Sequence, residues 1–369
     1  MAKYRAAVIG IGWMGILNDI GTRWTDPGPY GDRGQWHVDD IERPMPKVDV
    51  HRKFHFHERP PVTYAETLAN RPEVELVAGA ERDQSRLAVF GERYGVTALY
   101  TDAAEMLRNE RPDIVAISSN TKGRSDMACL AVENGAKGIM TEKPIAYTLE
   151  EADRMVKACA DVGVALVCGA TSTNHPSFAK AKELVVTDAI GDVVSIESDA
   201  PRSQHQNWSY FLDSTPAWVI GIGDTPPGPE GSEEFRGQGM MVAMDGQVVF
   251  FRKGAPAVRI SGTGGEVLKP ENYGVWELSQ DIDTQAGRKR VQMPWPEPQM
   301  TSRLVVSNGF NDIFDCLDGK LDEPKNSGRR VAVALEVEIA IKLSSAQGGV
   351  RIDLPLEDRS LDLKYDWHR

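Results

Sequence analysis

The chain has 369 residues, of which 41% are hydrophobic and 26% are charged, and its formal net charge is −12. This composition is typical of a globular protein with a sizeable buried core. The acidic balance excludes the basic surface that non-specific binding to nucleic acid or to anionic membranes requires. No apolar run reaches the ~18 residues of a membrane span, and no signal peptide precedes the first motif, so we expect a cytoplasmic protein.

The first half of the chain predicts strands that alternate with helices. A buried strand over 4–10 ends in a glycine-rich turn, and an irregular segment follows at about 18–61. Further strands are expected at 74–80, 113–118, 138–142 and 164–170, and helices at 85–95, 102–110, 125–135 and 148–163. Strands alternating with helices of this length predict parallel βαβ units and a doubly wound, Rossmann-type sheet.

Beyond about residue 171 the pattern changes to alternating strands. A helix over 177–186 precedes strands expected at 193–200, 247–253, 257–263 and 275–281, with hairpin turns at Asp245–Gly246 and Gly264–Gly265. We therefore predict an α/β chain of two domains. The first is a Rossmann domain over 1–170 that carries the 18–61 insertion, and the second is a mainly antiparallel α+β domain over 171–369.

The turn after the first strand has the pattern G-x-G-x-x-G. In a dinucleotide site the first glycine allows the tight turn, the second lets the backbone approach a pyrophosphate, and the third lets helix and strand pack closely. The following helix N-terminus supplies free N–H groups for the phosphates. We expect cofactor contacts from Gly10, Ile11, Gly12, Trp13, Met14 and Gly15.

An acidic residue usually follows such a turn after ~20 residues, at the end of the second strand, and binds the ribose hydroxyls. The first candidate here is Glu81, much further along the chain, and we attribute the excess length to the 18–61 insertion. A carboxylate at this position favours NAD and repels the 2′-phosphate of NADP. The neighbouring Arg82 can soften that preference by stacking on adenine or by pairing with a phosphate.

Lys143 follows the expected strand 138–142 within the motif Thr141-Glu142-Lys143-Pro144. The carboxyl ends of parallel strands form the edge at which such sheets place ligands, and Pro144 stiffens the backbone there. Lys143 is therefore a candidate for contacting a ligand, and a solvated lysine in a turn is the alternative.

Three motifs together resemble the glucose–fructose oxidoreductase/inositol dehydrogenase/MocA (Gfo/Idh/MocA) family. They are G-I-G-W-M-G at 10–15, P-D-I-V-A-I at 112–117 and A-x-x-N-G-A-K-x-I-M-T-E-K-P-I-A at 131–146. Residues 334–356 also resemble the closing helix and strand of that family. The resemblance implies an NAD-dependent oxidoreductase acting on a sugar or cyclitol, with Lys143 as a catalytic residue beside the nicotinamide. Oxidising a secondary alcohol by hydride transfer requires the hydroxyl proton to be removed, and a partly desolvated lysine can orient that oxygen and stabilise charge on it. It also implies a second domain whose large open sheet serves substrate binding and the contacts of a homo-oligomer, a dimer or a tetramer.

The resemblance also indicates further site residues. Many members carry an Asp and, four residues later, a His that acts as acid and base. No such pair occurs here, and His205 is the best candidate for that role, with Asn207 or Tyr210 assisting. The additional cofactor contacts that we expect are Ser119, Asn120, Glu142 and Lys143. The expected substrate contacts are Lys143, Arg124, Asn174, His175, His205 and Asn207.

Two departures from the family pattern bear on the substrate. The run 171–176 lacks the Arg that often precedes Asn-Pro, so the substrate should differ from those of the commonest members. Arg124 or Lys122 supplies positive charge suited to an anionic sugar, although solvated surface charge explains both equally well. The insertion contains His37, His51, His55 and His57, but their spacing matches no established metal site, so we expect no metal. We interpret the insertion as a loop over the active site or a subunit contact.

Two other functions remain open from the sequence. A redox-neutral glycosidase on the same scaffold would hold NAD tightly, oxidise a sugar hydroxyl transiently, eliminate the aglycone and return the hydride. A non-catalytic sensor would bind the dinucleotide or a sugar together with a protein partner. Net NADH distinguishes the first of these from a dehydrogenase, and the intact Lys143 argues against the sensor.

Overall fold

The structure, a computed structural model, describes residues 3–17, 61–199, 206–223, 237–271, 274–296 and 305–363. The chain forms two compact units that are discontinuous in sequence. The first unit comprises residues 1–146, 151–170 and 302–328, and the second comprises 147–150, 171–301 and 329–369. The segment 302–328 thus belongs with the N-terminal unit, while the domain limits expected at 170 and 171 remain a prediction.

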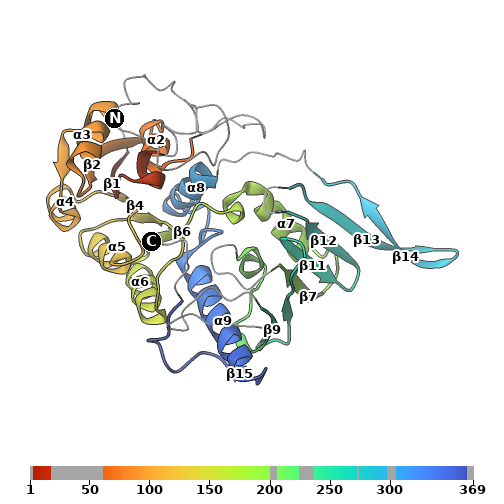
Figure 1. Cartoon of the computed structure of the whole chain (residues 1–369). Coiled ribbons are helices and arrows are strands. Elements are labelled where there is room, and N and C mark those ends of the chain that lie inside the picture. The colour runs from red at the N-terminus through yellow and green to blue at the C-terminus, as the bar shows by residue number, and fades with distance from the viewer. Residues whose placement is uncertain are drawn as a thin grey trace. The chain divides into compact units, whose positions relative to one another are not determined.

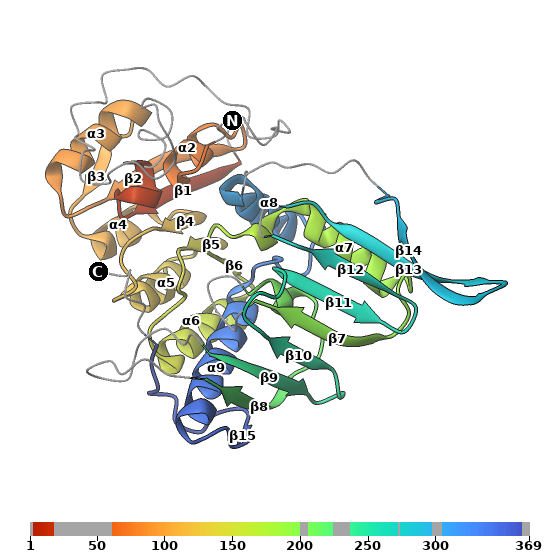
Figure 2. The same ribbon diagram turned by 45° about the vertical axis from the view of Figure 1, so that its right-hand side comes forward.

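The first unit is built on a parallel six-stranded sheet in the order β3-β2-β1-β4-β5-β6. Figure 1 labels β1, β2, β4 and β6, and Figure 2 also labels β3 and β5. Its strands are β1 (Tyr4–Ile9), β2 (Val74–Ala80), β3 (Ala98–Tyr100), β4 (Ile114–Ile117), β5 (Gly138–Thr141) and β6 (Ala165–Cys168). The predicted Rossmann-type sheet is confirmed, and only the short edge strand β3 was not predicted. The strand order reverses between β1 and β4, and ligands of such sheets bind outside the carboxyl ends of the strands at this reversal.

Five helices lie between these strands in the sequence, and local sequence signals set the ends of two of them, α3 and α4. They are α2 (Tyr64–Ala69), α3 (Gln84–Tyr94), α4 (Ala103–Glu110), α5 (Arg124–Glu133) and α6 (Leu149–Val162). Asp83 and Asp102 cap α3 and α4, each accepting hydrogen bonds from two backbone N–H groups of the first turn. Gly95 ends α3 at a φ of 67°, a left-handed conformation that glycine adopts without strain.

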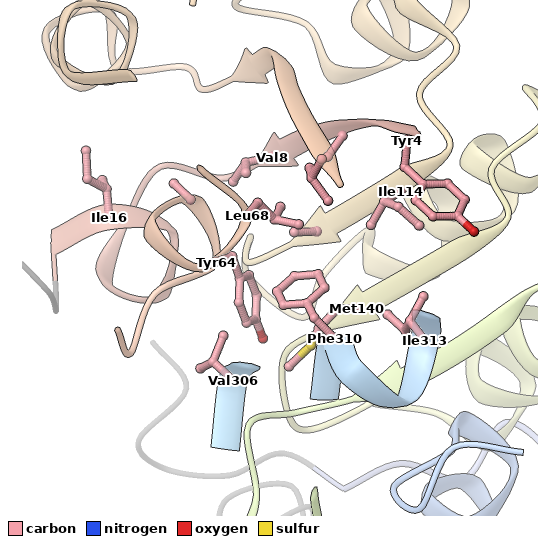
Figure 3. Packing of buried hydrophobic residues seen from close by; sticks show 14 of the residues in the cluster. Tyr4, Val8, Ile16, Tyr64, Leu68, Ile114, Met140, Val306, Phe310 and Ile313 are labelled. Carbon is pink, nitrogen blue, oxygen red and sulfur yellow. The ribbon is translucent and has the colours of Figure 1, made fainter. Parts of the chain in front are cut away.

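The first helix of the Rossmann fold is interrupted by the insertion. A short π-helix, η1 (Trp13–Leu17), follows the glycine turn, and α2 packs against it. Ile16 of η1 and Tyr64 of α2 belong to the same buried cluster (Figure 3). The insertion therefore leaves and rejoins the fold between two neighbouring helical turns, which explains why β2 and Glu81 come so late in the sequence. Residues 18–60, with the four histidines, lie outside the described residues.

A later helix completes the core of the first unit. Helix α8 (Val305–Leu317) lies against β5 and β6, and its Phe310 packs edge-on against Tyr64 at 5.9 Å between ring centroids (Figure 3). Gly138, the first residue of β5, lies against this helix. A Cβ there would lie 2.3 Å from Cγ2 of Ile313, so only glycine leaves room for that side chain. We did not predict α8, since its partners in the core are far away in the sequence.

The second unit contains a nine-stranded sheet in the order β14-β13-β12-β11-β7-β10-β9-β8-β15. Figure 2 shows these strands side by side. Its strands are β7 (Val193–Ser198), β8 (Pro216–Ile222), β9 (Gln238–Ala243), β10 (Val248–Phe251), β11 (Val258–Gly262), β12 (Gly265–Lys269), β13 (Glu277–Thr284), β14 (Gly287–Met293) and β15 (Ile352–Asp353). Of these neighbours only β7 and β10 run parallel, so the mainly antiparallel sheet is confirmed. Both predicted hairpin turns are present, joining β9 to β10 and β11 to β12.

The second unit also contains two helices, α7 (Pro176–Val186) and α9 (Gly328–Ala346). Gly221 and Gly239 on adjacent strands leave room for Ile341 of α9, which a Cβ at either position would meet within about 3 Å. Phe178 of α7 packs edge-on against Trp276, 5.0 Å between ring centroids, ahead of β13. Within the described part of the chain, no helix is long and apolar enough to cross a membrane.

Candidate functional site

The glycine turn and the loop after β4 are in direct contact at the carboxyl edge of the six-stranded sheet. A Cβ on Gly10 would lie 2.6 Å from the backbone nitrogen of Ser119, and Gly10 has a φ of +85°. A Cβ on Gly15 would lie 2.3 Å from the carbonyl oxygen of Gly10. Two of the three glycines are therefore required by the packing of the protein on itself.

Gly12 is different. A Cβ at this position would meet nothing among the described residues closer than Nη1 of Arg86, at 3.9 Å. Packing among the described residues thus gives no reason for glycine here, and these residues leave room for a close approach to the backbone of Gly12. This is the position at which a pyrophosphate approaches the turn in a dinucleotide site, so the residues present fit such a cofactor.

Glu81 links the end of β2 to the glycine turn. One carboxylate oxygen, Oε2, accepts a hydrogen bond from the Ile11 N–H at 2.7 Å. The other, Oε1, accepts from the N–H groups of Arg82 at 2.8 Å and Asp83 at 3.2 Å. Three backbone donors hold the carboxylate, and Oε2, which accepts only one of these bonds, has a second lone pair for a ribose hydroxyl. The carboxylate is therefore already oriented for the role that the sequence predicts.

The other expected cofactor contacts of the turn and the β4 loop differ in exposure. Ile11 and Gly15 are buried, Gly10, Gly12, Trp13, Met14 and Ser119 are partly buried, and Arg82 and Asn120 are exposed.

Lys143 directly follows the buried motif residues Thr141 and Glu142 at the end of β5, and it is half-buried itself. The Lys143 N–H donates to Oε2 of Glu142 at 3.1 Å. Tyr64 donates its hydroxyl to Oε1 of Glu142 at 2.5 Å and to the carbonyl oxygen of Thr141 at 3.1 Å. Burial and the charge of Glu142 raise the pKa of Tyr64 well above its usual value, so its hydroxyl stays a donor. Tyr64 thus holds the Glu142 carboxylate, which in turn holds the backbone N–H of Lys143.

No local sequence pattern singles out Tyr64. It follows the insertion as an ordinary aromatic residue at the start of a short helix. Its hydroxyl meets Glu142 only because the tertiary structure brings the start of α2 to the carboxyl end of β5.

Arg124 does not provide the accessible positive charge that we expected for an anionic substrate. Its side chain is 1% exposed. Nη1 donates to the carbonyl oxygens of Glu142, at 2.8 Å, and of Pro144, and Nη2 donates to the carbonyl oxygen of Ser119 at 2.7 Å. At the first residue of α5 the side chain turns inward, because the loops after β4 and β5 present buried carbonyl groups that need donors.

The predicted substrate residues of the second unit are described in part. Asn174 and Asn207 are 0% and 1% exposed, and Oδ1 of Asn207 accepts hydrogen bonds from the hydroxyls of Ser172 and Thr173, both at 2.9 Å. Asn207 therefore links two short 3₁₀ helices, η3 (Ser172–Asn174) and η4 (Asn207–Tyr210). His205 lies outside the described residues. The substrate roles of all three remain predictions.

His175 is the N-cap of α7. Its Nδ1 accepts a hydrogen bond from the Ser177 N–H at 3.1 Å and lies 2.8 Å from the Ser177 hydroxyl oxygen, which accepts from Nε1 of Trp276 at 2.9 Å. Because a backbone N–H can only donate, Nδ1 is an acceptor and the proton of the neutral ring lies on Nε2. If His175 contacts a substrate, as the sequence predicts, the neutral ring offers it a donor.

Among the described residues, no cluster of three or more His, Cys, Asp or Glu side chains is arranged to hold a metal ion.

Comparisons with known proteins relate part of the first unit to NAD-binding oxidoreductases. The model of an oxidoreductase family with an NAD-binding Rossmann fold matches residues 62–170. D-apiose dehydrogenase from Paraburkholderia graminis is 34% identical over 117 residues, which cover 32% of this chain and 31% of the relative. Myo-inositol 2-dehydrogenase from Thermotoga maritima is 29% identical over 159 residues, covering 41% and 47%. The chain thus spans about a third to a half of the length of these curated relatives.

A solved structure shows the same fold over more of the chain. The NAD binding oxidoreductase from Klebsiella pneumoniae superposes with a TM-score of 0.65 and covers 96% of this chain and 100% of that one. The two are 17% identical, so the likeness extends to the fold alone.

Proposed function

Through residues 62–170 the chain belongs to the Gfo/Idh/MocA family of oxidoreductases, and on this basis we propose that it transfers a hydride between NAD and a sugar or cyclitol. The reacting group of the substrate is a secondary hydroxyl in one direction and the corresponding ketone in the other. The observation that carries the proposal is the position of Lys143. It follows β5 at the same sheet edge as the glycine turn after β1 and Glu81 after β2.

Each residue at this edge of the sheet has a different role in the proposed reaction. Bound NAD would supply the hydride acceptor. Glu81 holds the adenosine ribose, and the open backbone at Gly12 admits the pyrophosphate. Lys143 orients the reacting oxygen and stabilises the negative charge that develops on it as the hydride leaves. The proton of the hydroxyl passes to a separate acid–base group, for which His205 is the candidate.

A panel of polyols tests the proposed activity. With NAD present, we expect myo-inositol, D-apiose or a methyl D-glucoside to produce NADH, measured as absorbance at the reduced-nicotinamide band. Reactions without NAD and without protein are the controls. Release of free sugar from the glucoside without net NADH would instead establish the redox-neutral glycosidase. NAD binding without turnover of any polyol would favour the sensor. No specific feature of the described residues favours either alternative.

The choice between NAD and NADP follows from Glu81. Its carboxylate should repel the 2′-phosphate, so we expect a lower Kd for NAD than for NADP. Glu81→Gln keeps an oxygen that accepts from the Ile11 N–H but removes the charge, and it should narrow the ratio of the two Kd values by about tenfold. Calorimetric titration of both cofactors measures this ratio. Glu75→Gln, on the same strand but remote from the turn, is the matched control. Equal affinities in the unmodified protein would contradict the assignment.

The homo-oligomer and the cytoplasmic location that the sequence led us to expect remain predictions.

A further inference from the structure

Arg124 occupies an unusual position for a charged side chain. It is 1% exposed, and its guanidinium donates to three backbone carbonyls of two different loops. Two of these carbonyls belong to the residues immediately before and after Lys143, Glu142 and Pro144. The third belongs to Ser119, in the loop after β4 that packs against Gly10. A single side chain therefore connects the lysine loop with the loop that borders the glycine turn.

We propose that Arg124 is a positioning residue for Lys143, which sets the place of the Lys143 amine relative to the nicotinamide. The Glu142–Lys143 and Pro144–Ile145 peptide groups, one on each side of the Lys143–Pro144 pair, are tied to one planar, rigid donor, so the backbone of Lys143 has little freedom to shift. The same guanidinium also donates to Ser119, so the loop that carries Lys143 keeps a fixed position relative to the loop that contacts the glycine turn. Displacements of about 1 Å can lower the rate of a positioned reaction by roughly a hundredfold. This inference rests on the proposed function of Lys143.

The surroundings of Arg124 suit a guanidinium rather than an ammonium group. Arginine presents five N–H donors in a fixed plane, whereas lysine presents three donors around a single nitrogen. One ammonium group cannot reach Ser119, Glu142 and Pro144 with the geometry that the two terminal nitrogens of Arg124 provide. The buried charge is also balanced locally, because the Glu142 carboxylate, held by Tyr64, lies in the same buried cluster. Arg124→Lys therefore keeps the charge but loses the connection between the loops.

A protection experiment tests the inference without relying on turnover. Lysine amines are labelled with acetic anhydride, with and without saturating NAD, and the labelling of Lys143 is followed by peptide mass spectrometry. In the unmodified protein NAD should protect Lys143 severalfold. In Arg124→Lys, calorimetry should show an NAD Kd within about threefold of normal, while the protection of Lys143 is lost. Turnover of the best polyol substrate should fall at least about tenfold at saturating substrate.

Arg71 is the matched control. It is also buried, at 3% exposure, and donates to the backbone carbonyl of Ser307 and to the side chains of Glu73 and Asn311. It supports the packing of α8 and has no contact with the lysine loop among those described above. Arg71→Lys should lower thermal stability and leave the NAD protection of Lys143 intact. If both arginine variants lost protection equally, Arg124 would have only a general structural role.

The outcomes separate the inference from the function on which it rests. If NAD does not protect Lys143 in the unmodified protein, the place of Lys143 beside the nicotinamide is wrong. If NAD protects Lys143 there and equally well in Arg124→Lys, with normal turnover, the positioning role is wrong. Should Arg124→Lys fail to fold, Arg124→Gln replaces it, because its amide keeps two N–H donors without a buried charge. Full protection and turnover in Arg124→Gln would likewise overturn the inference.

Discussion

Replacing Lys143 with Met is expected to lower turnover at least about 100-fold while the protein stays folded and binds NAD. Methionine keeps much of the aliphatic length, so the packing at the end of β5 should survive. It removes the ammonium group, however, and a neutral thioether cannot stabilise an oxygen on which negative charge develops. The loss should therefore fall on kcat. Steady-state kinetics with the best polyol, together with calorimetric titration of NAD, measure the two effects separately.

Lys137 provides the matched control for this experiment. It lies just before β5, at the amino end of the same strand, where it pairs with Asp113 at 2.7 Å and is 57% exposed. Parallel sheets place ligands at the carboxyl edge, so Lys137→Met should have nearly normal kinetics. A folded Lys143→Met protein with full activity would refute the catalytic role of Lys143, in the dehydrogenase and the glycosidase alike, since both begin with the same hydride transfer.

Removing either member of the buried ion pair between Asp312 and Lys325 is expected to destabilise the first unit by about 3–5 kcal/mol. The two side chains are 3% and 7% exposed, and the Lys325 ammonium contacts Oδ1 of Asp312. The Lys325 N–H also donates to Oδ2 of the same carboxylate at 3.0 Å. Asp312→Asn and Lys325→Met each leave one buried charge without its counter-ion. The free energy needed to bury that unpaired charge is larger than the stabilisation that the intact pair contributes.

Denaturant unfolding of the single variants and of the double variant Asp312→Leu/Lys325→Met distinguishes these costs. The double variant leaves no unpaired charge, so its loss should be smaller than the sum of the two single losses. Lys320→Met is the control, because Lys320 lies nearby but is 64% exposed in its pairs with Asp315 and Asp318. Its effect should stay within about 0.5 kcal/mol. An unchanged unfolding midpoint in Lys325→Met would show that the buried pair contributes little.

The segment that carries Lys325 is also bonded to β6, the edge strand of the parallel sheet. The next residue, Asn326, accepts from the Cys168 N–H at 3.0 Å through its carbonyl and donates to the carbonyl of Cys168 through its side chain. The segment after α8 is thus fastened to the carboxyl end of β6. Loss of the ion pair should loosen this attachment, and hydrogen exchange at the Cys168 amide would report it.

Local patterns were enough to predict β1, β2, β4, β5 and β6 of the first unit and its helices α3 to α6, but not β3, α2 or α8. Apolar runs identify the buried parallel strands, because both faces of such a sheet are covered and no polar alternation is possible. The glycine turn, Glu81 and Lys143 were also recognisable, because each follows directly on a predicted strand end. The carboxyl ends of parallel strands share one edge, so their common location follows from sequence order alone.

The residues that support these groups are determined by packing between distant segments. Tyr64 was not singled out, and Arg124 was expected to contact the substrate or to be a solvated surface charge, yet both turn inward to bind the backbone or carboxylate around Lys143. Helix α8 comes from far along the chain, and its place in the first unit also depends on tertiary packing. Its Ile313 lies against Gly138 of β5, a contact that exists only in the folded sheet. Which buried carbonyl receives which donor depends on packing between segments distant in sequence, and no local periodicity encodes it.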